Sequence, residues 1–400
     1  MRYKPVFSED LVTLDDVLQR LTHKEILATT AMYGPWTPEN RFDWSGYENL
    51  VREVLRSASV PATNVDTTWA IYNDWELTKN LIWRTAEIAM ENQEFIADDR
   101  PLVVAGLNTN AQELTVDGII PALRKQIQEI DVGLKARKFS RIRYMPVPDK
   151  RLYAAPGEVK IQIYREMGQM IGDFTDFGLV FFELDIGIPG FGSDFSPDEI
   201  AEILAQTPQI REYKSAIISK KQIPEYPYDF RSDVARIQIV ETVAPDRIQF
   251  STGNDWFISL ARAGKNIMKY GYLLGASQLS PVLFKQWRDA VRHNHALALA
   301  LELDLQAMAK DFWTPGNVGI YRHYVAIFLA MTGLISYPLP HPQCDLRYRV
   351  HPENYFLPLK HALRLGLVTA EDALDIALKF IPIARALPQS ELIRRIEWLS

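Results

Sequence analysis

The sequence is poor in cysteine and has no hydrophobic run long enough to cross a membrane. Its single cysteine, Cys344, excludes an intrachain disulfide framework and any metal site with several cysteine ligands, and it fits a reducing cytoplasm. The most apolar window, residues 324–339, is shorter than the about 20 residues of a membrane helix, so we expect a buried helix there. The first residues lack the apolar stretch of a signal peptide, so we expect a cytoplasmic protein.

An excess of one charge sign is missing as well. The chain carries 44 lysine and arginine residues against 50 aspartate and glutamate residues, a formal net charge of −6 over 400 residues. Nucleic acids and anionic lipids are bound by strongly basic surfaces, so this balance argues against both as partners. We therefore expect a small-molecule ligand, with no nucleic acid and no membrane.

Motifs that hold nucleotides or metal ions are also absent from the sequence. Residues 33–36, after the first predicted strand, are Tyr-Gly-Pro-Trp and not the glycine-rich phosphate turn of an open doubly wound sheet. His293 and His295 are two residues apart on a predicted helix, which places them on different faces, and there is no HExxH pattern. We therefore expect no metal site and no cofactor.

What the sequence does contain is a regular alternation of short β-rich apolar runs and longer amphipathic runs. Such alternation is typical of βαβ units with a parallel sheet, and eight rounds within about 250 residues favour a closed cylinder over an open sheet. The predicted fold is therefore α/β, a (β/α)8 TIM barrel with a C-terminal helical extension. The eight predicted strands are residues 26–33, 62–68, 102–107, 141–147, 178–185, 210–216, 247–252 and 268–274.

Three regions are expected along the chain. Residues 1–25 form an N-terminal helical segment, with a helix over 14–27 that packs on the barrel floor or on a neighbouring chain. Residues 26–280 form the barrel. Residues 281–400 form a C-terminal helical region, in which Gly366 ends one helix.

Lys214 is the most informative single residue in the predicted barrel. It lies near the end of the sixth strand, and active-site groups of such barrels project from the carboxyl ends of strands. An ammonium inside a barrel loses hydration, which favours the neutral amine that attack on a ketone requires. The alternative is structural: Lys214 pairs with Glu212 or Glu183, or its side chain extends outward to solvent.

Other polar side chains follow the predicted strands at the same end of the barrel, where they are candidates to bind substrate. They are Asp66, Thr67, Thr68, Asn108, Asp185, Ser251 and Asn254. Glu183, Tyr144 and Tyr153 lie at the exits of the fifth and fourth strands, where a carboxyl or phenol group can move protons.

Several segments, in order, resemble the dihydrodipicolinate synthase / N-acetylneuraminate lyase family of class I Schiff-base aldolases. The resemblance covers residues 26–335, and Lys214 falls on the family's imine-forming lysine. The matching segments are Asp66-Thr67-Thr68-Trp69-Ala70, residues 103–113, residues 181–199, residues 209–216, residues 251–255 and residues 270–281.

The resemblance implies a lyase, an aldolase or dehydratase, that acts on a 2-oxo acid or a sugar-derived keto acid through a Lys214 imine. Thr67 and Thr68 would hold the carboxylate of the substrate. The family's tyrosine after strand four is replaced here by the Met145 stretch, so Tyr144, Tyr153 or Glu183 would move protons instead. The family's tetramers imply a homo-oligomer, a dimer or tetramer.

Two other functions stay open. One is a non-catalytic barrel of the same family that keeps the pocket for ligand binding, because the strand-two and strand-four motifs are altered. The other is a metal-dependent sugar isomerase or epimerase that uses Asp66, Glu183 and Asp185.

Overall fold

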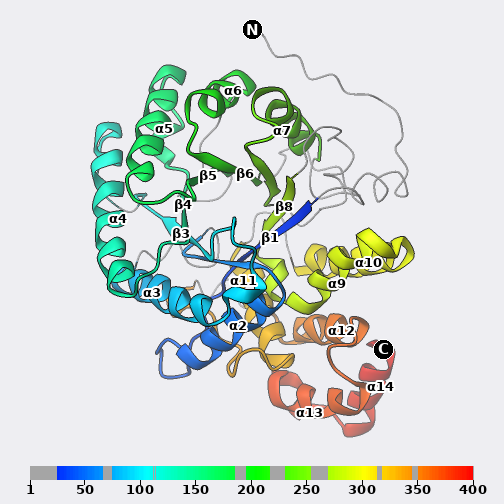
Figure 1. Ribbon diagram of the computed structural model, residues 1–400. Helices are drawn as coiled ribbons and strands as arrows, with labels where there is room; N and C mark the ends of the chain where they lie inside the picture. The colour runs from blue at the N-terminus through cyan, green and yellow to red at the C-terminus, as the bar shows by residue number, and fades with distance from the viewer. Residues whose placement is uncertain are drawn as a thin grey trace.

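The chain folds into a closed barrel of eight parallel strands that follow one another around the cylinder in sequence order (Figure 1). The computed structural model describes residues 25–65, 74–110, 112, 114–184, 195–216, 230–253, 269–312, 318–344 and 350–399. The prediction of a (β/α)8 barrel with C-terminal helices is confirmed. The strands are β1 (Glu25–Ala31), β2 (Val60–Thr63), β3 (Val103–Leu107), β4 (Ile142–Pro146), β5 (Leu179–Leu184), β6 (Ile210–Ala216), β7 (Gln249–Thr252) and β8 (Lys269–Leu274).

Helices cover the outside of the barrel (Figure 1). The helix that follows β5 begins at Ser196, whose hydroxyl group accepts a hydrogen bond from the backbone N–H of Glu199, while the Glu199 carboxylate accepts from the backbone N–H of Ser196. This reciprocal cap fixes the start of the helix. The outer helices are α2 (Trp44–Arg56), α3 (Trp75–Glu91), α4 (Ile119–Ala136), α5 (Gly157–Gly172), α6 (Pro197–Gln206) and α7 (Phe230–Val243).

One helical segment differs from expectation. Helix α7 was not predicted, because its β-branched residues, among them Ile237, Ile239 and Val240, weaken the helical pattern. The C-terminal helical region begins with two successive helices, α9 (Pro281–His293) and α10 (His295–Phe312). Asn294 separates them: its backbone is extended and its side-chain oxygen accepts from the N–H of Leu297, as in an N-cap.

The C-terminal helices pack against α10 and against one another, and the last three of them lie away from the barrel strands (Figure 1). They are α11 (Val318–Met331), α12 (Phe356–Arg364), α13 (Ala370–Phe380) and α14 (Gln389–Leu399). Residues 324–331 of α11 are all buried, which confirms the expected buried helix for this part of the window 324–339. The helix ends at Met331, so the rest of that window is not helical. Gly366 has φ of +66° just beyond α12, where it ends the helix as predicted, whereas α14 was not predicted.

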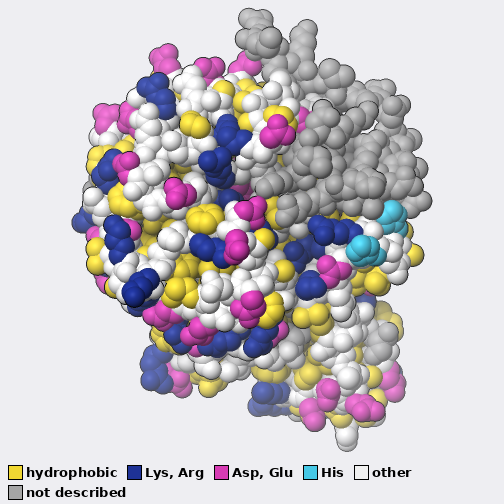
Figure 2. Space-filling view, viewed as in Figure 1, with side chains coloured by type: hydrophobic (Ala, Val, Ile, Leu, Met, Phe, Trp, Pro, Cys, Tyr) yellow, Lys and Arg dark blue, Asp and Glu magenta, His cyan; other side chains and the backbone are white. Residues whose placement is uncertain are grey.

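The expected helix over 14–27 is wrong at its end, because Glu25–Leu27 open strand β1 and pair with β8. Residues 1–24, and with them most of the expected N-terminal segment, lie outside the described residues. In the part of the chain that the structure describes, no helix is long and apolar enough to cross a membrane. Basic and acidic side chains are interspersed over the described surface in Figure 2.

Contacts between side chains show which face of each strand points into the barrel. Arg143 of β4 donates a hydrogen bond of 2.7 Å to Glu212 of β6. Since β5 lies between these strands, the two side chains meet inside the cylinder, where alternate strands share a layer. Glu183 of β5 binds Arg236 of the outer helix α7, so it points outward. Side chains alternate along each strand, and these contacts therefore orient their neighbours too.

Gly106 allows the exit of β2 to lie close against β3. A Cβ atom at position 106 would lie 1.9 Å from the carbonyl oxygen of Asn64. Asn64 itself has φ of +53°, a conformation that asparagine tolerates, and its amide donates to the Gly106 carbonyl at 3.0 Å. Only glycine fits this approach, which holds the end of β2 against β3.

We expect Gly106→Ala to lower the free energy of unfolding by about 1–3 kcal/mol, because the new methyl group forces the backbone of Asn64 to move. Urea denaturation of the purified chain measures this loss. The matched control is Gly172→Ala at the end of α5, where a Cβ atom would meet only the Gln209 side chain at 3.5 Å. The control should keep or slightly gain stability; an equal loss in both variants would contradict the role of the close approach.

Candidate active site

Lys214 lies inside the barrel on β6. Glu212, two residues earlier on the same strand, points inward to Arg143, so Lys214 shares that face. The side chain is 1% exposed, and its Nζ atom lies 4.0 Å from the centroid of the Phe182 ring on β5. A buried amine against an aromatic face is the central feature of this site.

Gly253, directly after β7, makes room for the Lys214 side chain. A Cβ atom at position 253 would lie 2.8 Å from Cε of Lys214 and 2.6 Å from Cβ of Ala216. The backbone N–H of Gly253 donates to the carbonyl of Ser215 at 2.5 Å, which holds the two strand ends together. A glycine is therefore needed at position 253 because any larger residue would take the space of the Lys214 side chain.

A buried polar network fills the barrel next to Lys214. Ser251, the register partner of Lys214 on β7, donates to Glu212 at 2.7 Å and accepts from the Gln249 amide at 2.8 Å. Glu212 also accepts from Arg143 at 2.7 Å. Burial lowers the pKa of Arg143 below its ordinary range, although the Glu212 charge opposes the shift.

The sequence predicts Ser251 as a site residue but does not predict its hydrogen-bond partners, Gln249 and Glu212. Glu212 had been considered only as an alternative ion-pair partner for Lys214, and its ion pair is instead with Arg143. The signal for Glu212 was its position two residues before Lys214 in a strand, which puts both on one face. Arg143 had no such signal, because its strand gives no indication of which face turns inward.

Glu183 does not lie beside Lys214, which corrects its expected role in proton transfer. Its carboxylate accepts two hydrogen bonds from Arg236 of α7, at 2.7 and 3.0 Å, and one from the Tyr213 hydroxyl group. Burial, followed by the Glu183 charge, raises the pKa of Tyr213 well above its ordinary value. The group is a buried ion pair between the sheet and α7, on the face opposite to Lys214.

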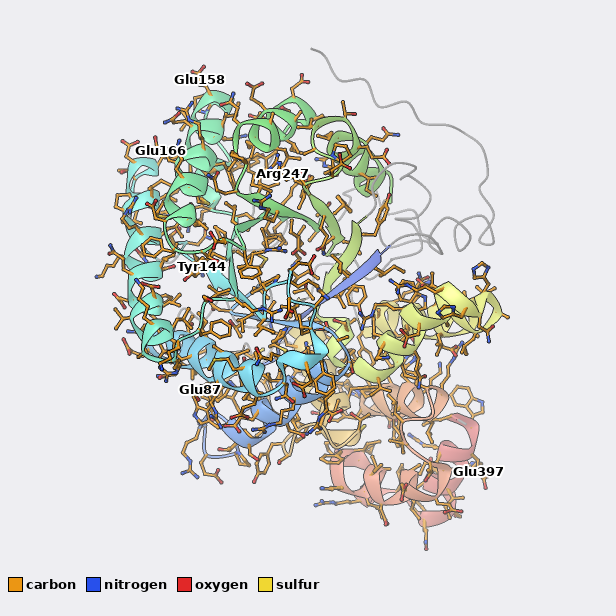
Figure 3. The ribbon with its side chains drawn as sticks, viewed as in Figure 1. Glu87, Tyr144, Glu158, Glu166, Arg247 and Glu397 are labelled. Carbon is orange, nitrogen blue, oxygen red and sulfur yellow. The ribbon has the colours of Figure 1, made fainter. Side chains whose placement is uncertain are left out.

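Tyr144 points away from Lys214, and Tyr153 lies on the loop after β4. Tyr144 follows the inward-facing Arg143 and therefore points outward, between β4 and α4 (Figure 3). Burial, with a smaller effect of Asp131 on α4, raises its pKa above the ordinary value of 10. This placement corrects the expected catalytic role of Tyr144. Tyr153 follows β4 on the short turn at 150–152 and is 49% exposed.

Asn108 belongs to a hydrogen-bonded seam between the loops after β3 and β4. Its side-chain oxygen accepts from the N–H and the amide of Asn110, at 3.0 and 3.2 Å. Asn110 in turn donates to the Pro148 carbonyl at 3.1 Å and accepts from the Lys150 N–H at 2.9 Å. Asn108 is buried at the carboxyl end of β3, where its contacts shape the loops around the barrel mouth.

Asp149 is the charged centre of the same seam. It accepts from the Thr109 hydroxyl at 2.7 Å and from Arg151, whose Nε lies 2.7 Å away. Burial would raise the pKa of Asp149, but the hydrogen bonds from Arg151 and Thr109 outweigh it and hold the pKa below its ordinary value. The ion pair keeps the two loops in one arrangement.

Five predicted substrate-binding residues lie outside the described residues: Asp66, Thr67, Thr68, Asp185 and Asn254. Their roles stay predictions. Within the described ranges, no group of three His, Cys, Asp or Glu side chains is arranged to hold a metal ion. Of the three acids proposed for a metal-dependent isomerase, the one described, Glu183, faces the helices.

The closed parallel barrel with an interior lysine on its sixth strand defines an α/β protein of the (β/α)8 class. No protein-family model matches the sequence, and no curated protein matches it significantly. Solved structures do match the fold. The dihydrodipicolinate synthase of Thermotoga maritima is 18% identical, with a TM-score of 0.61 over 86% of this chain and 100% of that chain.

Two further structures are similar in the same way. A monomeric dihydrodipicolinate synthase variant is 17% identical, with a TM-score of 0.63 over 87% of this chain and 99% of that chain. The sialic acid aldolase of Ruminococcus gnavus is 15% identical, with a TM-score of 0.59 over 90% of this chain and 99% of that chain, and its catalytic lysine mutant matches as well. The predicted resemblance is thus confirmed at the level of the fold.

We expect Asp149→Asn to lower the free energy of unfolding by about 2 kcal/mol at neutral pH, because charge-assisted hydrogen bonds to Arg151 are lost. The native pKa of Asp149 lies below its ordinary value of 3.8. Its stabilisation is therefore complete above that value and disappears as the pH falls through the lower native pKa. Urea denaturation of both proteins from pH 7 to pH 3 should show the difference narrowing in acid; a constant difference would contradict this account.

Proposed function

We propose that this chain is a lyase that forms a Schiff base between Lys214 and the carbonyl carbon of a 2-oxo acid. One observation carries the proposal: the amine of Lys214 is buried inside a closed barrel, against Phe182 and with space provided by Gly253. A lysine kept only for solubility would extend its amine to water. A buried amine next to an active-site mouth is the arrangement that nucleophilic catalysis requires.

The chemistry follows from the imine. The neutral amine of Lys214 attacks the carbonyl carbon, and the carbinolamine loses water to give a protonated imine. In an aldolase, the imine nitrogen accepts the electron pair of the bond between C3 and C4, so that this bond breaks, C4 leaves as an aldehyde when its hydroxyl group loses a proton, and an enamine forms. Protonation of the enamine at C3 and addition of water return Lys214 and release the keto acid. In a dehydratase, C3 instead loses a proton to give the enamine, whose electron pair expels the protonated hydroxyl group at C4 as water, and hydrolysis of the resulting conjugated imine frees Lys214.

Similarity to known barrels supports the proposal. The solved structures that match this fold include dihydrodipicolinate synthase and sialic acid aldolase. A further match is described as a catalytic lysine mutant of the aldolase. The sequence resemblance places Lys214 at the imine-forming lysine of that family. Thr67 and Thr68 are the proposed carboxylate ligands, and Tyr153 is the proposed phenol for proton transfer.

A non-catalytic binding barrel is the second candidate function. It is favoured by the strand-four position where the family carries a tyrosine, because Met145 follows the outward-facing Tyr144 and so points into the barrel. A thioether cannot transfer a proton. Such a barrel would retain the pocket and bind a keto acid without cleaving it.

Borohydride trapping distinguishes the two functions. The purified chain is incubated with pyruvate or with sugar-derived 2-oxo acids whose far end is an uncharged polyol. It is then reduced and measured by intact mass spectrometry. We expect one adduct per chain, with the mass of the keto acid less one water plus two hydrogens, and no adduct in Lys214→Met. Lys160→Met is the matched control, since Lys160 is also buried near an aromatic ring but pairs with Glu199 outside the barrel, at 3.3 Å.

The control variant should form the adduct as the wild type does. An adduct that persists in Lys214→Met would overturn the assignment of the amine. The absence of any adduct in the wild type, together with saturable keto acid binding by calorimetry, would favour the non-catalytic barrel.

A further inference from the structure

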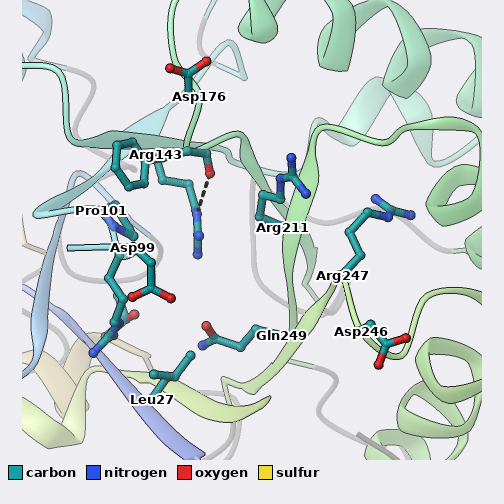
Figure 4. Close-up of a pocket in the computed structure, with 12 residues that line it drawn as sticks. Leu27, Asp99, Pro101, Arg143, Asp176, Arg211, Asp246, Arg247 and Gln249 are labelled. Carbon is teal, nitrogen blue, oxygen red and sulfur yellow. Dashed lines mark hydrogen bonds between the residues drawn. The ribbon is translucent and has the colours of Figure 1, made fainter. Parts of the chain in front are cut away.

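A cavity of about 320 Å³ opens at the amino end of the barrel, opposite to the mouth where Lys214 is expected to act. Its lining includes residues of three strands, Thr29 of β1, Arg143 of β4 and Gln249 of β7. Figure 4 shows Arg143 and Gln249 at the cavity. A volume of this size accommodates a small metabolite. Neither the proposed function nor the sequence analysis assigns a role to this end of the barrel.

Several arginines line this cavity, among them Arg143, Arg211 and Arg247 (Figure 4). The positive charge of Arg211 lowers the pKa of both others, after the larger effect of burial, so the three charges lie within electrostatic reach. Like charges near one another are unfavourable, although solvent screens part of the charge of Arg211, which is exposed. An anion between them would relieve the repulsion.

Carboxylates do not neutralise these arginines, apart from the Glu212 partner of Arg143. Arg247 donates to backbone carbonyls of Thr207 and Ile210, at 3.1 and 2.9 Å, which hold it in place without cancelling its charge. Among the described residues, Arg211 forms no ion pair. This leaves two guanidinium groups at the cavity with no carboxylate partner.

The aspartates of the cavity lie at its rim. Asp99, Asp176 and Asp246 are all exposed to solvent, and none forms an ion pair with the three arginines in the described part of the chain. The inner wall instead presents the Arg143 guanidinium, with its side chain only 11% exposed, beside the Thr29 hydroxyl group. A ligand that enters therefore meets hydrogen-bond donors at depth and water-screened carboxylates outside.

We propose that this cavity binds the phosphate group of a small phosphorylated molecule, or free phosphate, through Arg143 and Arg211. Guanidinium groups match phosphate oxygens with pairs of parallel hydrogen bonds, and a dianion benefits most from several cations. Arg143 retains capacity for such a ligand, since its hydrogen bonds to described residues engage Nε with the Phe177 carbonyl and Nη1 with Glu212.

Arg143 also links the cavity to the other end of the barrel. Its partner Glu212 accepts from Ser251, the register neighbour of Lys214. A phosphate bound to Arg143 would weaken the interaction between Arg143 and Glu212. The negative charge of Glu212 would then be less compensated, which would change the reactivity of Lys214. This effect rests on the proposed function, whereas binding of phosphate does not.

Binding is measured on the full chain by calorimetry and by thermal unfolding, with inorganic phosphate and with glycerol 3-phosphate, against sodium chloride at equal ionic strength. We expect saturable binding that raises the Tm beyond the chloride control. Tighter binding of the ester identifies a phosphorylated metabolite as the ligand, and equal or weaker binding identifies free phosphate. Arg211→Gln should weaken binding about tenfold, the effect of one charge-assisted hydrogen bond.

The matched control is Arg41→Gln, whose side chain is 78% exposed and far from the cavity, and it should bind as the wild type does. Arg211 has no partner to lose, so its substitution leaves the fold intact. Lys214→Met should still bind phosphate, which separates this test from the proposed function. Binding no stronger than that of chloride, or equal binding by Arg211→Gln and the wild type, would overturn the proposal.

Discussion

Pairing of the first strand with the last is the constraint on which the rest of the structure depends. Six residue pairs, from Glu25 with Lys269 to Thr30 with Leu274, join β1 to β8 and close the sheet. A closed sheet has an inside and an outside, so every strand residue must point to one of them. The position of the Lys214 amine follows from this closure.

Two glutamates on neighbouring strands show how strongly the closure decides chemistry. Glu183 on β5 and Glu212 on β6 are both buried, both accept from an arginine, and both accept from a hydroxyl group. Glu183 faces α7 and ties a helix to the sheet. Glu212 faces the interior, where it lies two residues from Lys214. The face of the sheet to which each glutamate points thus decides whether it forms a structural ion pair with a helix or lies beside the candidate site.

The interior network is unusual for a barrel of this class, whose inner layers are mostly branched apolar side chains. Burial of an arginine and a glutamate costs several kcal/mol before their attraction offsets it, so apolar packing would serve stability as well. Here Arg143, Glu212, Gln249 and Ser251 satisfy one another. Arg143 and Gln249 line the cavity at the amino end, and Ser251 is the register partner of Lys214, so the network runs along the barrel interior from the amino end towards Lys214.

Much of the fold was predictable because its signals are local. The strands have a period of two, Ser196 and Pro197 mark a helix start, and Gly366 marks a helix end, and each depends on a few neighbouring residues. The missed helix α7 had a weak local signal, because it is rich in β-branched residues. Lys214 was identified as the candidate lysine from its position near the end of the sixth strand and from the family resemblance, with an outward-pointing side chain left open as the alternative.

The sequence by itself determined the eight strands, their order and the candidate lysine, because alternation and capping are properties of short segments. Only the tertiary structure decided which face of each strand turns inward. That choice placed Arg143 and Glu212 inside and Glu183 and Tyr144 outside. The physical reason is that a period of two is the same for both faces, and strand pairing around the closed cylinder, over contacts far apart in the chain, breaks the tie.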